Sequence, residues 1–308
     1  MNPLKVISAI LSNSKFDGNS NNLIIINEGG LGDYIHSIPA IKYLKENNKK
    51  ITIITNDSFK DILHDTKYAN NKLKLTSPKL VMNSKTNIGF FDNTFDFNAE
   101  RIKRKYITRN WREIHWAEFY LNTVKDLFKL NKKFIMKQRK SSPKYISIHP
   151  GSSNPEKNWS IEKFIWIGKQ LSQNNKVMFL IGPQDKDLEP IIKKSGLKII
   201  ETSNFSELGN IASKTKLYIG NDSGPMHFFS LYTCKILGIF TYGCAYTHYP
   251  YSNNAWYYFE EKIFNDYYKN GKISKINLTK ENCLKQVKLI LGGKKELLSN
   301  FYKVKLND

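Results

Sequence analysis

The fold is decided by one stretch, Gly220-Asn221-Asp222-Ser223-Gly224-Pro225-Met226-His227. An apolar run, 217–219, precedes it, and a second apolar run begins at Phe228. A strand that ends in a turn of small residues and restarts as a helix leaves backbone N–H groups free at the helix start, where the helix dipole also favours an anion. Because Asp222 and Ser223 are ordinary N-cap residues, the stretch alone fits a capped helix without a ligand equally well.

Two further turns of this kind occur earlier in the chain. One is Gly29-Gly30-Leu31-Gly32-Asp33, after the run 23–26, and the other is His149-Pro150-Gly151-Ser152-Ser153, after the run 145–148. Each turn follows a strand-like run and precedes a helical pattern, which predicts an α/β protein with parallel sheets. In such a protein the ligand lies at the carboxyl ends of the strands.

The wider pattern predicts two domains of alternating strands and helices. Short buried strands are predicted at 23–27, 51–55, 145–149, 177–181, 198–201 and 217–220, and helices at 39–46, 116–130, 160–172, 187–195 and 225–232. The Lys-rich stretch 131–144 contains Ser141-Ser142-Pro143 and is the best linker candidate. We therefore predict domains at 1–142 and 143–308, with an amphipathic helix in the tail at 279–298.

Composition limits the class of protein. The chain has 308 residues, of which 40% are hydrophobic and 24% charged, as in soluble globular proteins of two ordinary domains. No apolar run approaches the eighteen or so residues that cross a bilayer, and the apolar stretch 4–11 lacks the layout of a signal peptide. We therefore expect a cytoplasmic protein. The three cysteines, Cys234, Cys244 and Cys283, show no C-x-x-C spacing and indicate neither a disulfide framework nor a zinc site.

The net charge of +21 favours anionic partners such as nucleic acid, acidic lipid headgroups or a phosphorylated glycolipid. A composition rich in Lys, Asn and Ile explains the same charge without any partner. The exception is the cluster Arg101-Ile102-Lys103-Arg104-Lys105, followed by Arg109, because arginine binds phosphate and carboxylate through a rigid fork. No nucleic-acid-binding motif surrounds the cluster, so we expect an acidic acceptor there and no nucleic acid.

Taken together, three segments resemble the lipopolysaccharide heptosyltransferase family, glycosyltransferase family nine, which has the GT-B fold. The resemblance rests on Gly32-Asp33-Tyr34-Ile35-His36-Ser37-Ile38-Pro39-Ala40, on His149 to Ser153 with Lys157 and Trp159, and on 220–227. It implies two Rossmann-like domains whose parallel sheets face a cleft, with a C-terminal helix that crosses back to the first domain. The first domain would bind the acceptor and the second the nucleotide sugar.

The resemblance also implies a reaction. The expected activity is inverting, metal-independent transfer of a heptose from ADP-heptose to a lipopolysaccharide core acceptor, with no cofactor beyond the donor substrate. Asp33 matches the family's catalytic carboxylate and would be the base, a role compatible with capping the helix that follows it. Arg101, Arg104 and Arg109 would bind the anionic glycolipid acceptor, with peripheral contact at the inner face of the cytoplasmic membrane.

The donor diphosphate is expected at the backbone N–H groups of Ser223, Gly224 and Met226, aided by the Lys157 ammonium. His227 either bonds a phosphate oxygen or is a buried histidine bonded to backbone, and Gln184 or Asp185 would receive the ribose hydroxyls. The predicted donor-binding residues are Ser152, Ser153, Lys157, Gln184, Asp185, Asp222, Ser223, Gly224, Met226 and His227. Asp185-Lys186-Asp187 matches the metal-binding D-x-D of GT-A enzymes, but acidic residues that cap a helix are commoner, and no metal is implied.

The sequence departs from the family at two places. Asn27, Glu28 and the two following glycines replace the usual basic and hydroxyl residues before Gly32-Asp33, and Phe228 and Phe229 replace small residues after His227. These departures leave the identity of donor and acceptor open. The alternatives are a transferase of the same family that uses another nucleotide sugar for a surface glycan or a protein, and a non-catalytic protein that binds a glycan or a nucleotide sugar.

Overall fold

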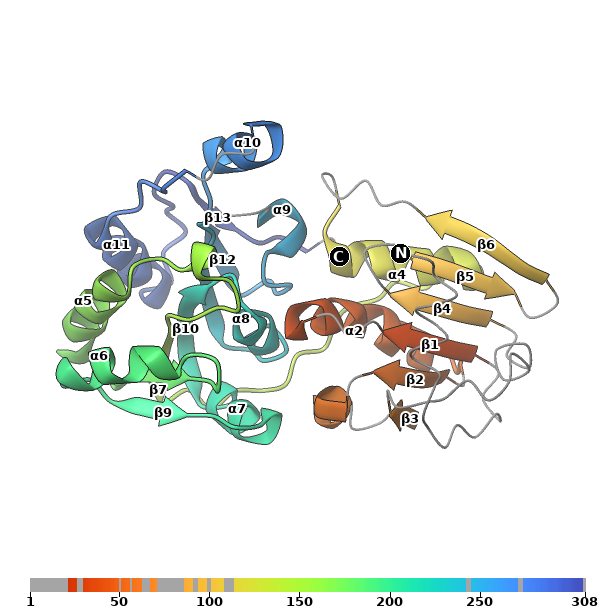
Figure 1. Cartoon of the computed structure of the whole chain (residues 1–308), viewed down its shortest axis with the longest axis horizontal. Helices are drawn as coiled ribbons and strands as arrows, with labels where there is room; N and C mark the ends of the chain where they lie inside the picture. Colours follow the sequence, from red (N-terminus) through yellow and green to blue (C-terminus); the bar gives the residue numbers. More distant parts are fainter. Residues whose placement is uncertain are drawn as a thin grey trace. The chain divides into compact units, whose positions relative to one another are not determined.

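A computed structural model describes residues 22–26, 30–49, 51–55, 57–62, 67–70, 86–90, 94–98, 101–107, 114–241, 245–270 and 274–306. The chain divides into two compact units between Ile135 and Met136, inside the stretch 131–144 that the sequence predicts to be a linker (Figure 1). The acceptor and donor roles predicted for the two halves stay predictions. The predicted features at 4–11, Glu28, Arg109 and Cys244 lie outside the described residues.

The first unit contains a six-stranded sheet in the order β3-β2-β1-β4-β5-β6. Strands β1 to β4 are mutually parallel, whereas β5 and β6 continue the sheet as antiparallel strands. The sequence predicts the first two strands, but not the four that follow. The bounds are β1 Asn22–Ile26, β2 Ile51–Thr55, β3 Lys67–Asn70, β4 Thr86–Phe90, β5 Thr94–Asn98 and β6 Arg101–Ile107.

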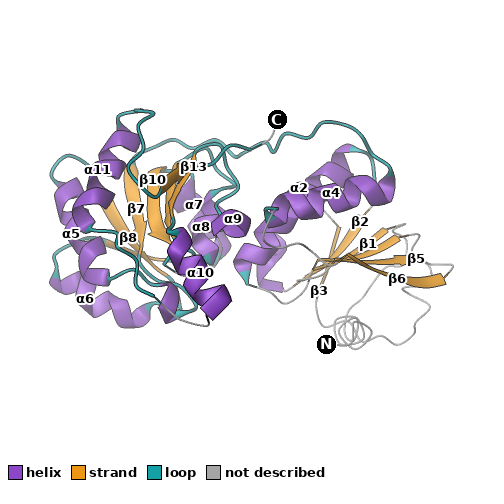
Figure 2. Ribbon diagram, turned by 90° about the horizontal axis from the view of Figure 1, so that it is seen from above, coloured by secondary structure: helices purple, strands orange, loops and turns teal. Residues whose placement is uncertain are grey.

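Helices α2 (Leu31–Glu46) and α4 (Trp116–Phe128) lie on one face of this sheet, and a short 3-10 helix, η1 (Asp57–Ile62), follows β2 (Figure 2). The helical pattern predicted for 39–46 is only the second half of α2, which passes through Pro39. Proline at this position removes one helical hydrogen bond. The burial of Tyr34, Ile35 and Ile38 in the turns before it compensates for that loss.

The second unit contains a seven-stranded sheet in the order β13-β12-β11-β10-β7-β8-β9. Strands β7 to β12 are all parallel, and only β13 is antiparallel, to β12. Numbered within the unit, the parallel strands lie in the order 3-2-1-4-5-6 of a dinucleotide-binding fold, which reverses between β7 and β10. The bounds are β7 Tyr145–His149, β8 Val177–Ile181, β9 Ile199–Glu201, β10 Thr215–Asn221, β11 Lys235–Ile239, β12 Ala255–Tyr258 and β13 Phe301–Lys303.

Helices cover both faces of this second sheet. One face is covered by α5 (Ile161–Ser172), α6 (Glu189–Lys194) and α11 (Lys280–Leu291), and the other by α7 (Phe205–Ala212) and α8 (Gly224–Phe229) (Figure 2). The remaining elements are the 3-10 helices η2 (Pro155–Lys157) and η3 (Lys186–Leu188), α9 (Ala245–His248) and α10 (Glu261–Asn270). Side chains of α5, α6 and α11 form one apolar core with the sheet.

The tail differs in part from the predicted helix at 279–298. Helix α11 ends at Leu291 because Gly292 and Gly293 follow, the latter with a φ of 70° that favours glycine. The chain then forms β13 at the edge of the second sheet. The buried side chains of α11 belong to the core of the second unit, and the crossing towards the first unit stays a prediction. No helix in the described part of the chain is both long and apolar enough to cross a membrane.

Candidate functional site

His149, the last residue of β7, connects three loops at the carboxyl edge of the second sheet. Its ring is buried, with Nε2 3.1 Å from Asp185 Oδ2 and Nδ1 3.3 Å from Ser223 Oγ. Asp185 lies in the loop after β8, and Ser223 in the loop after β10. Because β7 and β10 flank the point where the strand order reverses, the His149 side chain lies where a doubly wound sheet binds its ligand.

Asp185 links its own loop to the end of β7. Its Oδ2 accepts a hydrogen bond of 3.0 Å from the Gly182 N–H as well as contacting His149. Burial alone would raise the pKa of the carboxyl, but the His149 hydrogen bond and charge and the Gly182 N–H hold it below its usual range. A Cβ added to Gly151 would lie 1.8 Å from Asp185 Oδ1, so only glycine fits there. The predicted contact of Asp185 with a ribose stays a prediction.

Asn221, the last residue of β10, holds the loop that follows β7. Its Oδ1 accepts the Trp159 N–H at 2.9 Å, and its Nδ2 donates to the Pro150 carbonyl at 2.6 Å. In the same loop the Ser152 hydroxyl lies 2.8 Å from Asn158 Oδ1. No role was predicted for Asn221, Asn158 or His149. The signal for Asn221 and His149 was a polar residue that closes an otherwise apolar strand.

Asp222 positions the Lys157 ammonium, the positively charged group of the site. Its Oδ2 lies 2.6 Å from Lys157 Nζ, and its Oδ1 lies 3.4 Å from His227 Nε2. Asp222 is buried, whereas the Lys157 side chain is 29% exposed. Burial would raise the pKa of the Asp222 carboxyl, but the hydrogen bond with His227 and the charges of Lys157, His227 and His248 together hold it well below its usual range. The ammonium of Lys157 is therefore held by a buried charge and still reaches solvent.

Helix α8 begins beside this ion pair. Ser223 is its N-cap residue in extended conformation, and Gly224 and Pro225 open its first turn. The first N–H groups of a helix have no carbonyl partner within the helix, so those of Gly224 and Met226 suit an anion. The Met226 side chain is fully buried, and a Cβ on Gly238 would lie 2.6 Å from its Sδ. Any ligand contact of Met226 is therefore through the backbone, as predicted.

The structure places the ten predicted donor-binding residues on the loops and short helices that follow β7, β8 and β10, at one edge of the second sheet. Ser153 and Gln184 are exposed there. His227 is buried and its Nε2 lies 3.4 Å from Asp222 Oδ1, while its predicted bond to a phosphate oxygen or to backbone stays a prediction. The roles of these residues towards a donor stay predictions.

The residues predicted for the base and the acceptor belong to the first unit. Asp33 lies half-buried in the first turn of α2, where its Oδ2 accepts the Gly30 N–H at 3.0 Å, so the capping role is observed. Its role as base stays a prediction. Arg101 and Arg104 lie on β6, the edge strand of the first sheet, with their side chains outside the described part of the structure.

We expect the unfolding free energy of the Asp222→Asn variant to fall less at acidic pH than that of the wild-type protein. The folded-state pKa of Asp222 is below its unfolded value, so its stabilisation is fully present above the unfolded pKa and is lost as the pH falls through the folded pKa. Below about pH 4, the difference in unfolding free energy between wild type and Asp222→Asn should narrow by about 1.4 kcal/mol for each unit that the pH falls. Urea unfolding from pH 7 to pH 3 measures this. Glu281→Gln, at an exposed carboxylate, is the control, and parallel curves for wild type and Asp222→Asn would contradict the assignment.

The fold and the site define the class of protein. A doubly wound sheet with a partly buried ion pair, a helix N-terminus and glycine turns at its switch point is typical of nucleotide-binding α/β proteins. Within this class the chain belongs to glycosyltransferase family 9 (heptosyltransferase), whose family model matches residues 90–266, more than half of the chain. The protein is therefore a glycosyltransferase of the lipopolysaccharide heptosyltransferase family, and its two-domain α/β architecture is of the GT-B type.

Three known proteins illustrate the similarity. Lipooligosaccharide heptosyltransferase 2 of Campylobacter jejuni is 25% identical over 247 residues, covering 68% of this chain and 77% of the relative. The structure of a family 9 glycosyltransferase from Veillonella parvula matches 93% of this chain and 100% of its own, with a TM-score of 0.65 and 16% identity. The E. coli ADP-heptose LPS heptosyltransferase II matches 88% of this chain and 99% of its own, with a TM-score of 0.65 and 13% identity.

Proposed function

We propose that this protein is an inverting, metal-independent glycosyltransferase that moves a heptose from ADP-heptose to a lipopolysaccharide core acceptor. The observation that supports it best is the Lys157–Asp222–His227 arrangement beside the first turn of α8, at the switch point of the second sheet. Membership of family 9 supports heptose as the transferred sugar. The similar E. coli enzyme is named for ADP-heptose, which favours ADP as the leaving group.

The donor diphosphate binds between Lys157 and the start of α8. The ammonium of Lys157 and the N–H groups of Gly224 and Met226 offer positive charge to the phosphate oxygens, while the hydroxyls of Ser152 and Ser153 add hydrogen bonds. As the glycosidic bond breaks, negative charge grows on the β-phosphate, and these groups stabilise it without a metal ion. Stabilisation of this kind is usually the largest single contribution to catalysis. No cofactor takes part, since the nucleotide sugar is a substrate.

Asp33 acts as the general base of the transfer. Its carboxylate takes the proton from an acceptor hydroxyl, the hydroxyl oxygen attacks the anomeric carbon, and ADP leaves from the opposite face. One direct displacement inverts the configuration at that carbon. Support for Asp33 comes from its place in the Gly32-Asp33 motif, at the start of the helix that follows β1.

The acceptor is an anionic glycolipid. Arg101 and Arg104 on β6, with Arg109, bind its acidic groups, because guanidinium forks match carboxylate and phosphate geometry. The protein works on the cytoplasmic side of the inner membrane, where it contacts the surface peripherally. The charge of +21 supports this partner.

Calorimetric titration with ADP, UDP, GDP and CMP, without added metal, tests the proposed donor. We expect selective ADP binding, weakened about 10- to 100-fold by Lys157→Ala, because a hydrogen bond to a charged group contributes about 1.5–3 kcal/mol. Lys176→Ala removes an exposed lysine that precedes β8, away from the loops of the site, and should leave the affinity unchanged. Selectivity for another nucleotide would move the function to a different sugar. Failure to bind any of the four would favour a non-catalytic glycan-binding protein.

A further inference from the structure

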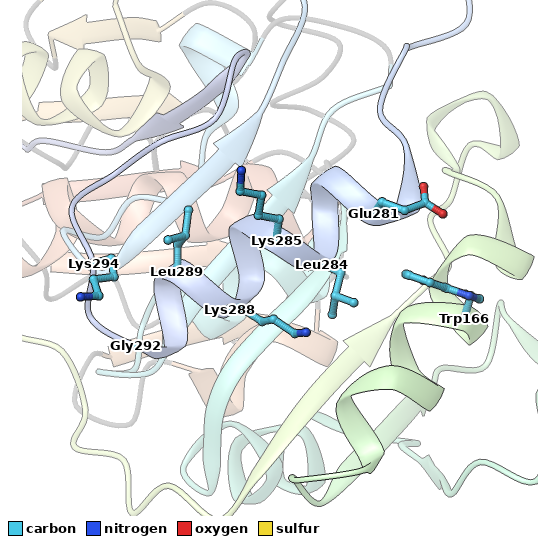
Figure 3. Close-up of a pocket in the computed structure, with 8 residues that line it drawn as sticks. All are labelled: Trp166, Glu281, Leu284, Lys285, Lys288, Leu289, Gly292 and Lys294. Atoms are coloured by element: carbon cyan, nitrogen blue, oxygen red, sulfur yellow. The ribbon is translucent and has the colours of Figure 1, made fainter.

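A groove lies on the outer face of the second unit, between α5 and α11 (Figure 3). None of its lining residues belongs to the candidate site, and its volume is about 470 Å³. Trp166 comes from α5, and the other residues come from α11 and the turn that follows it (Figure 3). The lining residues are Trp166, Glu281, Leu284, Lys285, Lys288, Leu289, Gly292 and Lys294.

The groove has an apolar floor and a cationic rim. Carbon atoms make up most of its lining, and they come from Trp166, Leu284, Leu289 and the lysine stems. Lysine side chains cover apolar surface with their stems while the ammonium groups stay in water. The ammonium group of a further lysine, Lys280, lies 4.8 Å from the centre of the Trp166 ring. The surface therefore suits a partner that is both anionic and partly apolar.

One carboxylate, Glu281, lines the groove, and its Oε1 lies 3.9 Å from the Lys280 ammonium. Lys285, Lys288 and Lys294 are all exposed, and within the part of the chain that the structure describes none of them lies within 4.0 Å of an acidic side chain. Near the adjacent helix α6 the opposite holds, because Lys186 and Lys193 form ion pairs with Glu201 and Glu189. Three lysines without a carboxylate partner among the described residues therefore line the groove.

Exposed aliphatic side chains occur on the same face. Leu297, 39% exposed, follows the turn that carries Lys294, and Ile191, 44% exposed, lies on α6. Helix α5 begins directly after the loop 150–160 of the candidate site. The face that carries the groove therefore adjoins the edge of the sheet where the donor is proposed to bind.

We infer that this face docks on an anionic phospholipid membrane, with a lipid headgroup at the lysine rim and its glycerol region against Trp166 and Leu284 (Figure 3). Lysine ammonium groups are attracted to acidic headgroups, and tryptophan prefers the boundary between headgroups and acyl chains. Nucleic acid is the less suitable partner, because only one aromatic side chain, Trp166, lines the groove and could stack on a base. The inference rests on the proposed function in one respect, since a lipid-linked acceptor is presented on such a membrane.

Co-sedimentation of the full chain with phosphatidylcholine vesicles, with and without phosphatidylglycerol, tests the docking. The triple variant Lys285→Gln, Lys288→Gln, Lys294→Gln should bind anionic vesicles on the order of 100-fold more weakly, given the contribution of each lysine near such a surface. The matched control is Lys133→Gln, Lys140→Gln, Lys144→Gln, with the same change in net charge at exposed positions of the stretch 131–144. The affinity of this control for anionic vesicles should fall no more than a few-fold.

A second measurement does not depend on charge. Brominated lipids should quench part of the tryptophan fluorescence, and Trp166→Phe should lose most of that quenching. The inference would be overturned if both triple variants lost the same affinity for anionic vesicles, or if quenching were unchanged in Trp166→Phe. So would weaker binding of an oligonucleotide by the groove variant with vesicle binding intact. Transfer to a short, lipid-free acceptor should be unchanged in the groove variant, so an inactive wild-type protein in that assay would contradict the proposed function and not the docking.

Discussion

Asp33→Asn is expected to lower the transfer rate by about 100- to 10,000-fold, the range that a positioned general base contributes. The amide of asparagine cannot take the proton from the acceptor hydroxyl. Its oxygen can still accept the Gly30 N–H that Asp33 accepts at 3.0 Å, so the start of α2 should remain folded. Steady-state kinetics with ADP-heptose and a core acceptor measure the rate, and calorimetry with ADP measures donor binding, which should be retained.

Glu46→Gln is the matched control, because it removes an exposed carboxylate from the other end of the same helix. Its kinetics should equal those of the wild type. If Asp33→Asn transfers sugar at the wild-type rate, Asp33 is only a helix cap and the base must be sought elsewhere. If the variant instead loses donor binding and transfer together, its defect lies in the fold.

Gly151→Ala is expected to destabilise the protein by about 2–3 kcal/mol and to weaken ADP binding at least tenfold. The added methyl group would lie 1.8 Å from Asp185 Oδ1, and the carboxylate cannot move away freely because His149 and the Gly182 N–H hold it. Overpacking of this kind costs about 1–3 kcal/mol, and the loss of buried hydrogen bonds adds to it. Displacement of the loop would also move Ser152 and Lys157. Urea unfolding and ADP titration measure the two effects.

A double variant separates the steric cause from other effects. Asp185→Ala removes the side chain that the new methyl group would meet, so Gly151→Ala should cost almost nothing when added to Asp185→Ala. Such non-additivity is expected only if the two residues are in contact. If the two costs add, the methyl group at position 151 acts through some other neighbour.

Much of the second unit could be predicted from its sequence. The runs at 145–149 and 177–181 form strands with those bounds, because each is short, apolar and followed by a turn of small or polar residues. Strands β11, β12 and β13, which form one side of the sheet, were missed. The Lys235–Ile239 strand follows the apolar helix α8 after only a few residues. A buried helix and a buried strand both appear as continuous apolar runs, so hydrophobic periodicity cannot show where one ends and the other begins.

The first unit was harder to predict. Strands β4 to β6 include polar and basic residues, as in Arg101–Ile107, and their strand character depends on pairing with a neighbour.

Contacts between distant segments also limited the prediction of the site. Lys157 was predicted from its motif, but its bond to Asp222, 65 positions along the chain, could not be read from spacing.

The α/β class, the three glycine turns and the resemblance to the family could be predicted from the sequence, because glycine turns and strand periods are local properties of the chain. The tertiary structure sets the strand order 3-2-1-4-5-6 and thereby brings His149, Asp185 and Ser223 together at one edge of the sheet. It also decided that α5 and α11 leave three unpaired lysines around one groove. Strand order and helix packing follow from which apolar faces bury one another, and that choice is made between segments far apart in the sequence.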